Sequence, residues 1–182
     1  MRVGLLGGSY DPVHYGHLRA AEWALEAFGL NRVLLIPARR SPFKGPASAP
    51  DPDRLAMLKL AARDNEALRV DDCELARDAP SYTVDTLRDL CGRSPDDTFA
   101  LIVGSDAARG IEQWREISAI REMAEIRVLG RPGASAFPGA SEFQGLAISS
   151  TEIREAVSQG RSIRYLTPES VRLYLEEKGL YK

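Results

Sequence analysis

Two reactive residue types are scarce in this chain of 182 residues, which has only two cysteines and two histidines. Cys73 and Cys91 are too few for a disulfide framework or a cysteine-based metal cluster. We interpret each as a small core residue in a reducing compartment. His14 and His17 are three positions apart. Chemistry that depends on imidazole is therefore confined to one short segment.

Long apolar runs and a strong net charge are also missing. No run approaches the roughly 20 apolar residues of a membrane span, and the apolar start of the chain is too short for a signal peptide. A formal net charge of -2 creates no basic field that would attract nucleic acid or an anionic membrane. We expect a cytoplasmic protein whose partners are small molecules, not nucleic acid or membrane. The sequence leaves a homo-oligomer open.

The composition and the hydrophobic pattern indicate a globular α/β protein. An apolar fraction of 44% and a charged fraction of 27% are ordinary for a folded domain, and the length suits a single domain over residues 1–182. Short apolar runs alternate with amphipathic segments. The expected strands are 3–6, 33–36, 68–70, 99–103, 126–129 and 146–148. The expected helices are 16–28, one opening at 51–52, 83–90, 112–123, one opening at 149–151 and one opening at 168.

This alternation predicts a doubly wound, mostly parallel sheet, followed by a small C-terminal helical part over residues 150–182. Ligands of such sheets bind beyond the carboxyl ends of the strands. Three polar tripeptides follow expected strands, and we expect them to meet at one edge of the sheet. They are Gly8-Ser9-Tyr10, Gly104-Ser105-Asp106 and Ser149-Ser150-Thr151.

The segment from Gly7 to His17 carries the strongest functional signal. It matches neither the dinucleotide G-x-G-x-x-G spacing nor a Gly-Lys-Ser/Thr phosphate loop, so a phosphate site here must use other donors. His14 and His17 fall where a helix begins, and the first amides of a helix favour an anion. We interpret both as phosphate ligands. Capping residues of a turn are the alternative; structural zinc would lack a third close ligand, although Asp11 is near.

Ser149, Ser150 and Arg154 form a second candidate phosphate site. Hydroxyl groups at a helix start and a guanidinium in its first turn can bind the same anion. Ser149 and Glu152 also match the S-x-x-E capping box, which is the alternative.

Other segments have both a functional and a structural interpretation. Asp106 could bind a ribose hydroxyl or help hold a metal, or it could cap a helix. Trp114 could stack on an aromatic ring or pack in the core. Lys44 lies in a proline-rich loop with Arg39 and Arg40, where it could clamp a triphosphate or stay solvated.

The segments from Gly8 to His17 and from Ile148 to Arg154 resemble the two signatures of a nucleotidyltransferase superfamily, a His-x-x-His turn and a late Ile-Ser-Ser-Thr segment. Within it, the chain is similar over its whole length to the bacterial nicotinate-nucleotide adenylyltransferase family. Further matching segments are Ile36-Pro37-Ala38, Ser81 to Leu87, Gly104-Ser105-Asp106, Trp114, Arg131-Pro132-Gly133 and Leu180-Tyr181. The chain departs from the family at Ser9 and Tyr10, where Thr and Phe are usual, and at Phe43, where His is usual.

The resemblance implies a Rossmann-like nucleotidyltransferase fold and transfer of the adenylyl group of ATP to nicotinate mononucleotide, a step of NAD biosynthesis, with Mg²⁺ accompanying ATP. The implied catalytic residues are His14, His17 and Arg154. The implied ATP-binding residues are Gly8, Ser9, His14, His17, Lys44, Gly104, Asp106, Ser149, Ser150 and Arg154. The implied nicotinate-nucleotide-binding residues are Ser81, Tyr82, Thr83, Thr86, Asp106 and Trp114. A phosphopantetheine adenylyltransferase and a non-catalytic nucleotide-binding sensor are the alternatives, and acid-over-amide selectivity stays open.

Overall fold

The structure, a computed structural model, describes residues 1–40, 45–130, 138–143 and 145–182. The described residues contain one parallel sheet with the strand order β3-β2-β1-β4-β5. Its strands are β1 (Arg2–Gly8), β2 (Arg32–Pro37), β3 (Leu68–Val70), β4 (Thr98–Gly104) and β5 (Ala124–Leu129). The chain builds outward from β1 to β3 and then returns to the other side of β1. The strand order thus reverses between the paired strands β1 and β4. The carboxyl ends of these two strands are the topological switch point, where ligands bind in such sheets.

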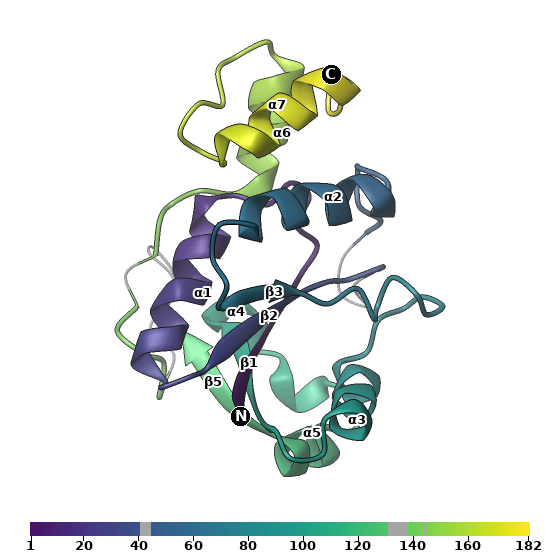
Figure 1. Ribbon diagram of the computed structural model, residues 1–182, viewed down its shortest axis with the longest axis vertical. Helices are drawn as coiled ribbons and strands as arrows, with labels where there is room; N and C mark the ends of the chain where they lie inside the picture. Colours follow the sequence, from purple (N-terminus) through teal and green to yellow (C-terminus); the bar gives the residue numbers. More distant parts are fainter. Residues whose placement is uncertain (41–44, 131–137, 144) are drawn as a thin grey trace.

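Helices cover both faces of the sheet, which confirms the expected doubly wound fold (Figure 1). The helices are α1 (Tyr15–Ala27), α2 (Asp51–Ala62), α3 (Thr83–Arg93), α4 (Ser105–Ala108), α5 (Ile117–Met123), α6 (Ser150–Ser158) and α7 (Glu169–Lys178). α1 and α2 share one buried apolar cluster with the sheet, and α3 and α5 share another. α6 and α7 form the expected C-terminal helical part, beside α2 (Figure 1). No helix among the described residues is long and apolar enough to cross a membrane.

The central strand β1 packs against both apolar clusters through alternate residues. Val3 and Leu5 are buried on the side of α3 and α5. Gly4 faces the other side, where a Cβ atom would lie 2.7 Å from Leu30 Cδ1 and 2.9 Å from Ile102 Cδ1. Glycine is therefore the residue that lets these two side chains close over the middle of the sheet.

Two expected elements are wrong. The helix expected over 112–123 is a 3-10 turn at Ile111–Gln113 followed by α5, because Glu116 between them adopts a left-handed conformation with φ of 53°. The Glu116 carboxylate binds Arg88 of α3 at 2.5 Å, a long-range contact that periodicity does not reveal. The strand expected over 146–148 is a tight turn, in which the Ile148 amide donates to the Leu146 carbonyl at 2.9 Å.

A buried arginine fixes α2 to the turn that follows β1. Arg54 has no exposed surface. Its Nη1 donates to the Ser9 carbonyl at 2.6 Å and its Nη2 donates to the Asp51 carboxylate at 2.5 Å. Because a buried charge is costly unless it is paired, these contacts hold Ser9 in a defined place.

Arg54→Ala is expected to lower the free energy of unfolding by about 2–4 kcal/mol, because it leaves a cavity and an unpaired Ser9 carbonyl. Urea unfolding of the purified proteins measures this. Arg63→Ala at the end of the same helix is the matched control, since the Arg63 side chain is 60% exposed. Its effect should stay within about 0.5 kcal/mol. Equal effects of the two substitutions would contradict the role given to Arg54.

Candidate active site

The turn between β1 and α1 is held by a buried tyrosine. Tyr10 has no exposed surface, has a positive φ of 48°, and donates its hydroxyl to the Leu6 carbonyl at 2.6 Å. Its ring lies where a side chain on Gly8 would point, since a Cβ there would be 3.3 Å from the ring. The Tyr10 and His17 rings form a T-shaped pair with their centroids 4.9 Å apart. The Tyr10 ring thus supports His17 from the core side.

The two histidines lie together at the start of α1. Their rings stack with centroids 3.7 Å apart and an interplanar angle of 26°. His14 is the N-cap residue of α1 and is 6% exposed, and its backbone amide donates to His17 Nδ1 at 3.3 Å. A Cβ on Gly16 would lie 2.9 Å from His14 Nδ1, so the stacked arrangement requires glycine there. Both the capping and the phosphate-binding interpretations fit this geometry.

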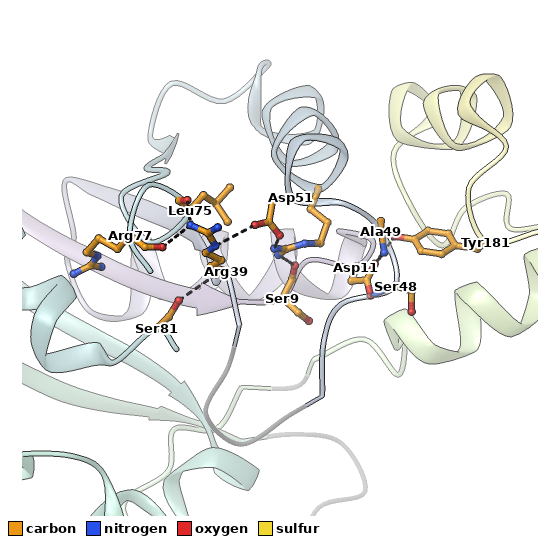
Figure 2. Close-up of polar contacts among 11 residues, drawn as sticks. Ser9, Asp11, Arg39, Ser48, Ala49, Asp51, Leu75, Arg77, Ser81 and Tyr181 are labelled. Atoms are coloured by element: carbon orange, nitrogen blue, oxygen red, sulfur yellow. Dashed lines mark hydrogen bonds and ion pairs between the residues drawn. The ribbon is translucent and has the colours of Figure 1, made fainter. Parts of the chain in front are cut away.

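Asp11 is the most connected residue of the turn. The residue is 3% exposed, and its carboxylate accepts hydrogen bonds from the Ser48 amide at 2.7 Å and the Ala49 amide at 3.0 Å. The Tyr181 hydroxyl donates to the same carboxylate at 2.6 Å (Figure 2). The sequence indicated Asp11 only as a neighbour of the histidines. Its partners are 37, 38 and 170 positions away, so no local pattern could reveal them.

The start of α6 contacts this turn through the Ser150 hydroxyl. Ser149 is the N-cap, and its Oγ accepts the Glu152 amide at 3.1 Å, so the capping interpretation of this residue is confirmed. The Ser150 hydroxyl donates to the Pro12 carbonyl at 2.9 Å. The Ser149–Ser150 segment therefore reaches the β1–α1 turn through Ser150, as the sequence predicted, and each serine already makes a structural contact.

Arg154 approaches the turn from the next turn of α6. Its Nη1 donates to the Asp11 backbone carbonyl at 2.7 Å and lies 3.7 Å from the Asp11 carboxylate. Its Nη2 donates to the Thr151 hydroxyl at 3.3 Å. The side chain is 28% exposed, so part of the guanidinium faces solvent next to the histidine turn.

The end of β4 adds the third predicted tripeptide. β4 pairs with β1 in register, with Ile102 opposite Leu6, so the carboxyl ends of the two strands lie side by side. Gly104 caps the short helix α4, whose first turn contains Asp106. Gly104 and Asp106 are exposed at this edge. The switch point thus has the β1–α1 turn on one side and the Gly104–Asp106 segment on the other.

A buried network lies at the start of α3. The Thr86 hydroxyl donates to Glu74 Oε1 at 2.7 Å and accepts from Arg77 Nη2 at 2.6 Å. Thr86 is 3% exposed and Glu74 is 9% exposed. Burial raises the pKa of the Glu74 carboxyl, and the hydrogen bonds from Thr86 and Ser81 offset this only in part. Neither Glu74 nor Arg77 was singled out in the sequence, where each stands as an ordinary charge in a loop.

The segment after β2 pairs with the segment before α3. The Arg39 amide donates to Ser81 Oγ at 3.1 Å, and the Arg39 guanidinium donates to the Arg77 carbonyl at 2.8 Å (Figure 2). Arg39 therefore has a structural role on this side of the site. An open cavity of about 320 Å³ lies next to it, lined by Arg39, Arg40 and residues 46–51. Lys44, Phe43 and the 131–133 segment lie outside the described residues.

Tyr82 and Trp114 both pack against the apolar cluster of α3 and α5. Tyr82 is the N-cap of α3, Thr83 is its first residue, and Trp114 follows the 3-10 turn. Tyr82 and Trp114 are half-buried, and the Arg115 guanidinium lies 4.8 Å from the Tyr82 ring centroid. Core packing of Trp114 is thus present, and its remaining exposed surface is compatible with stacking.

Glu74→Gln is expected to make the free energy of unfolding less dependent on pH. A carboxyl whose pKa is raised on folding binds its proton more tightly in the folded protein than in the unfolded one. Its contribution to the free energy of unfolding is therefore complete below its ordinary pKa of about 4.3 and is lost as the pH rises through the raised pKa. The wild type should therefore lose stability relative to Glu74→Gln as pH rises from the ordinary pKa upward. Urea unfolding between about pH 4.5 and 7.5 measures this. The exposed Glu66→Gln is the control, and a constant difference for Glu74→Gln would contradict the assignment.

Comparison with known proteins identifies the family. Residues 5–156 match the cytidylyltransferase-like family. A probable nicotinate-nucleotide adenylyltransferase of Thermus thermophilus is 43% identical over the whole of both chains, and one of Desulfitobacterium hafniense is 41% identical over 100% of this chain and 96% of its own.

A solved structure shares the fold. The nicotinic acid mononucleotide adenylyltransferase of Plasmodium falciparum, complexed with NaAD, superimposes with a TM-score of 0.80 at 18% identity, over 99% of this chain and 97% of that one. With the histidine turn and the Ser149–Arg154 segment meeting at the sheet's switch point, the chain belongs to the nicotinate-nucleotide adenylyltransferases of the cytidylyltransferase-like family.

Proposed function

We propose that the protein transfers the adenylyl group of ATP to nicotinate mononucleotide, forming nicotinate adenine dinucleotide and pyrophosphate in NAD biosynthesis. The observation that carries this proposal is the stacked pair His14 and His17 at the start of α1. Arg154 lies at the same turn, where it donates a hydrogen bond to the Asp11 backbone carbonyl. Full-length relatives with this activity in their names support it.

The chemistry requires no nucleophile from the protein. The phosphate of the mononucleotide is largely ionised at pH 7 and attacks the α-phosphorus of ATP. A P–O bond forms to the acceptor phosphate, the bond to the β-phosphate oxygen breaks, and pyrophosphate leaves. Catalysis then consists of positioning and charge stabilisation. We assign this role to His14, His17 and Arg154, with His17 nearest the transferred group.

The directions of the hydrogen bonds at the start of α6 suggest different roles for Ser149 and Ser150. Ser149 Oγ accepts a hydrogen bond from the Glu152 amide, so the Ser149 hydroxyl proton is still available to donate to a phosphate oxygen. The Ser150 proton is used on the Pro12 carbonyl, so Ser150 holds the helix start in place. Gly8, Ser9, Gly104 and Asp106 would line the ATP pocket at the switch point, and Lys44 would reach the triphosphate.

The acceptor nucleotide is assigned to the α3 side. Because the Thr86 hydroxyl is committed to Glu74 and Arg77, the nicotinate carboxylate would bind the first amides of α3 around Thr83, which have no partners within the helix. Ser81 and Tyr82 would shape this entrance, Asp106 of α4 would contact the same nucleotide, and Trp114 would stack on the pyridine ring. Thr86 thus belongs to the site as support for the helix start.

Mg²⁺ would enter with ATP. Among the residues that the structure describes, no group of three histidine, cysteine, aspartate or glutamate side chains is placed to hold a metal ion. This donor set fits an ion carried mainly by substrate phosphates and water, which is how Mg²⁺ is usually bound. When bound it would neutralise phosphate charge, with Asp106 as the exposed carboxylate at the end of β4.

Pyrophosphate release from ATP and Mg²⁺ tests the proposal, with nicotinate mononucleotide, nicotinamide mononucleotide and phosphopantetheine as separate acceptors. We expect fast release with the acid mononucleotide. Release with the amide as well would show a relaxed carboxylate site at α3. Release only with phosphopantetheine would reassign the acceptor. ATP binding without release from any acceptor would indicate a nucleotide-binding sensor.

His17→Ala is expected to lower kcat about 10²–10³-fold, the scale for losing one preorganised donor at a transition state. His17→Asn retains a donor and should keep part of the rate. Steady-state kinetics with the acid mononucleotide measure both, and thermal unfolding shows whether each variant is folded. An unchanged kcat in His17→Ala would remove His17 from the chemistry.

A further inference from the structure

The last turn of the chain reaches into the nucleotide turn. Tyr181 extends from the end of α7 to Asp11, and its hydroxyl meets the buried carboxylate at 2.6 Å (Figure 2). Tyr181 has a positive φ of 65°, which side-chain-bearing residues rarely adopt. Strain of this kind persists only where surrounding contacts impose it. The left-handed backbone conformation of Tyr181 accompanies the hydrogen bond from its hydroxyl to Asp11.

The donors around Asp11 divide into neutral and charged groups. The Ser48 amide, the Ala49 amide and the Tyr181 hydroxyl are neutral, and they supply the hydrogen bonds that the carboxylate accepts. The Arg154 guanidinium stays 3.7 Å from the carboxylate and donates to the Asp11 backbone carbonyl at 2.7 Å. Because neutral donors satisfy the carboxylate, the positive charge of Arg154 is left to act on an anion outside.

We propose that Tyr181 is a positioning residue for ATP, which holds Arg154 toward the triphosphate by satisfying the Asp11 carboxylate with a neutral donor. Without that hydroxyl, the carboxylate loses the shortest of these three hydrogen bonds and attracts the Arg154 guanidinium, which already lies 3.7 Å away. The guanidinium then moves inward and binds the phosphates less well. This proposal rests on the proposed function only in naming ATP as the anion.

Tyr181 can donate throughout the working pH range. Burial raises the pKa of its hydroxyl, the hydrogen bond to Asp11 raises it further, and the charges of Arg154 and Arg54 offset this in part. Tyr181 is therefore a constant component of the site and not a pH-dependent switch.

Tyr181→Phe tests the proposal by removing one oxygen atom. We expect the Kd of MgATP, measured by isothermal titration calorimetry, to rise about 5-fold, the scale of one typical hydrogen bond. The matched control is Tyr174→Phe, because the Tyr174 hydroxyl donates to Asp53 of α2 at 2.8 Å and so makes a similar link from the C-terminal helices. Equal Kd values in both variants would mean that Tyr181 serves helix docking only, which overturns the proposal.

The Arg154→Ala background shows whether Tyr181 acts through Arg154. If it does, adding Tyr181→Phe to Arg154→Ala should leave the Kd of MgATP unchanged, whereas independent effects would multiply. Multiplying effects would overturn the proposal. Pyrophosphate release by the wild type is measured in parallel. A wild type that binds MgATP without releasing pyrophosphate would refute the proposed function alone, because the Tyr181 comparison uses binding and not turnover.

Discussion

The buried carboxylate of Asp11 is the constraint on which the site depends. The carboxylate of a residue that is 3% exposed must have its hydrogen bonds met inside the protein, or folding would bear a large desolvation cost. The donors to the carboxylate come from the segment before α2 and from Tyr181 beyond α7, and Arg154 of α6 donates to the backbone carbonyl of the same residue. The hydrogen bonds of one residue therefore bring three distant parts of the chain together around the histidine turn.

A second buried carboxyl, that of Glu74, lies in the hydrogen-bond network at the start of α3. The Glu74 carboxyl accepts a hydrogen bond from the Thr86 hydroxyl, and burial raises the pKa of Glu74. Its charge acts as far as Tyr10, where burial first and then Glu74 raise the pKa of the phenol. Tyr10 in turn packs against His17. Tyr10 therefore has a neighbour in each region: the Glu74 charge raises the pKa of its hydroxyl, and its ring contacts His17 of the β1–α1 turn.

The sequence predicted what local pattern encodes. Alternating apolar runs located the five strands found in the sheet, and the scarcity of histidine directed attention to His14 and His17. The break at Glu116 and the turn at 146–148 were missed because long-range contacts and local turn geometry override periodicity there. Arg54 and Tyr181 were not identified as organising residues for the same reason, since each acquires its role from a partner 45 or 170 positions away.

Hydroxyl groups show why residue type alone does not assign a role. Ser149, Ser150 and Thr86 all resemble phosphate or carboxylate ligands in sequence, yet a hydroxyl has a single proton. Ser149 accepts a hydrogen bond and keeps that proton for a ligand, whereas Ser150 and Thr86 donate theirs to a carbonyl and a buried carboxylate. Only Ser149 among these three hydroxyls thus keeps a proton that could be donated to an anion, whereas Ser150 and Thr86 use theirs inside the protein. The direction of each hydrogen bond, which only the fold determines, therefore narrows the roles that residue type leaves open.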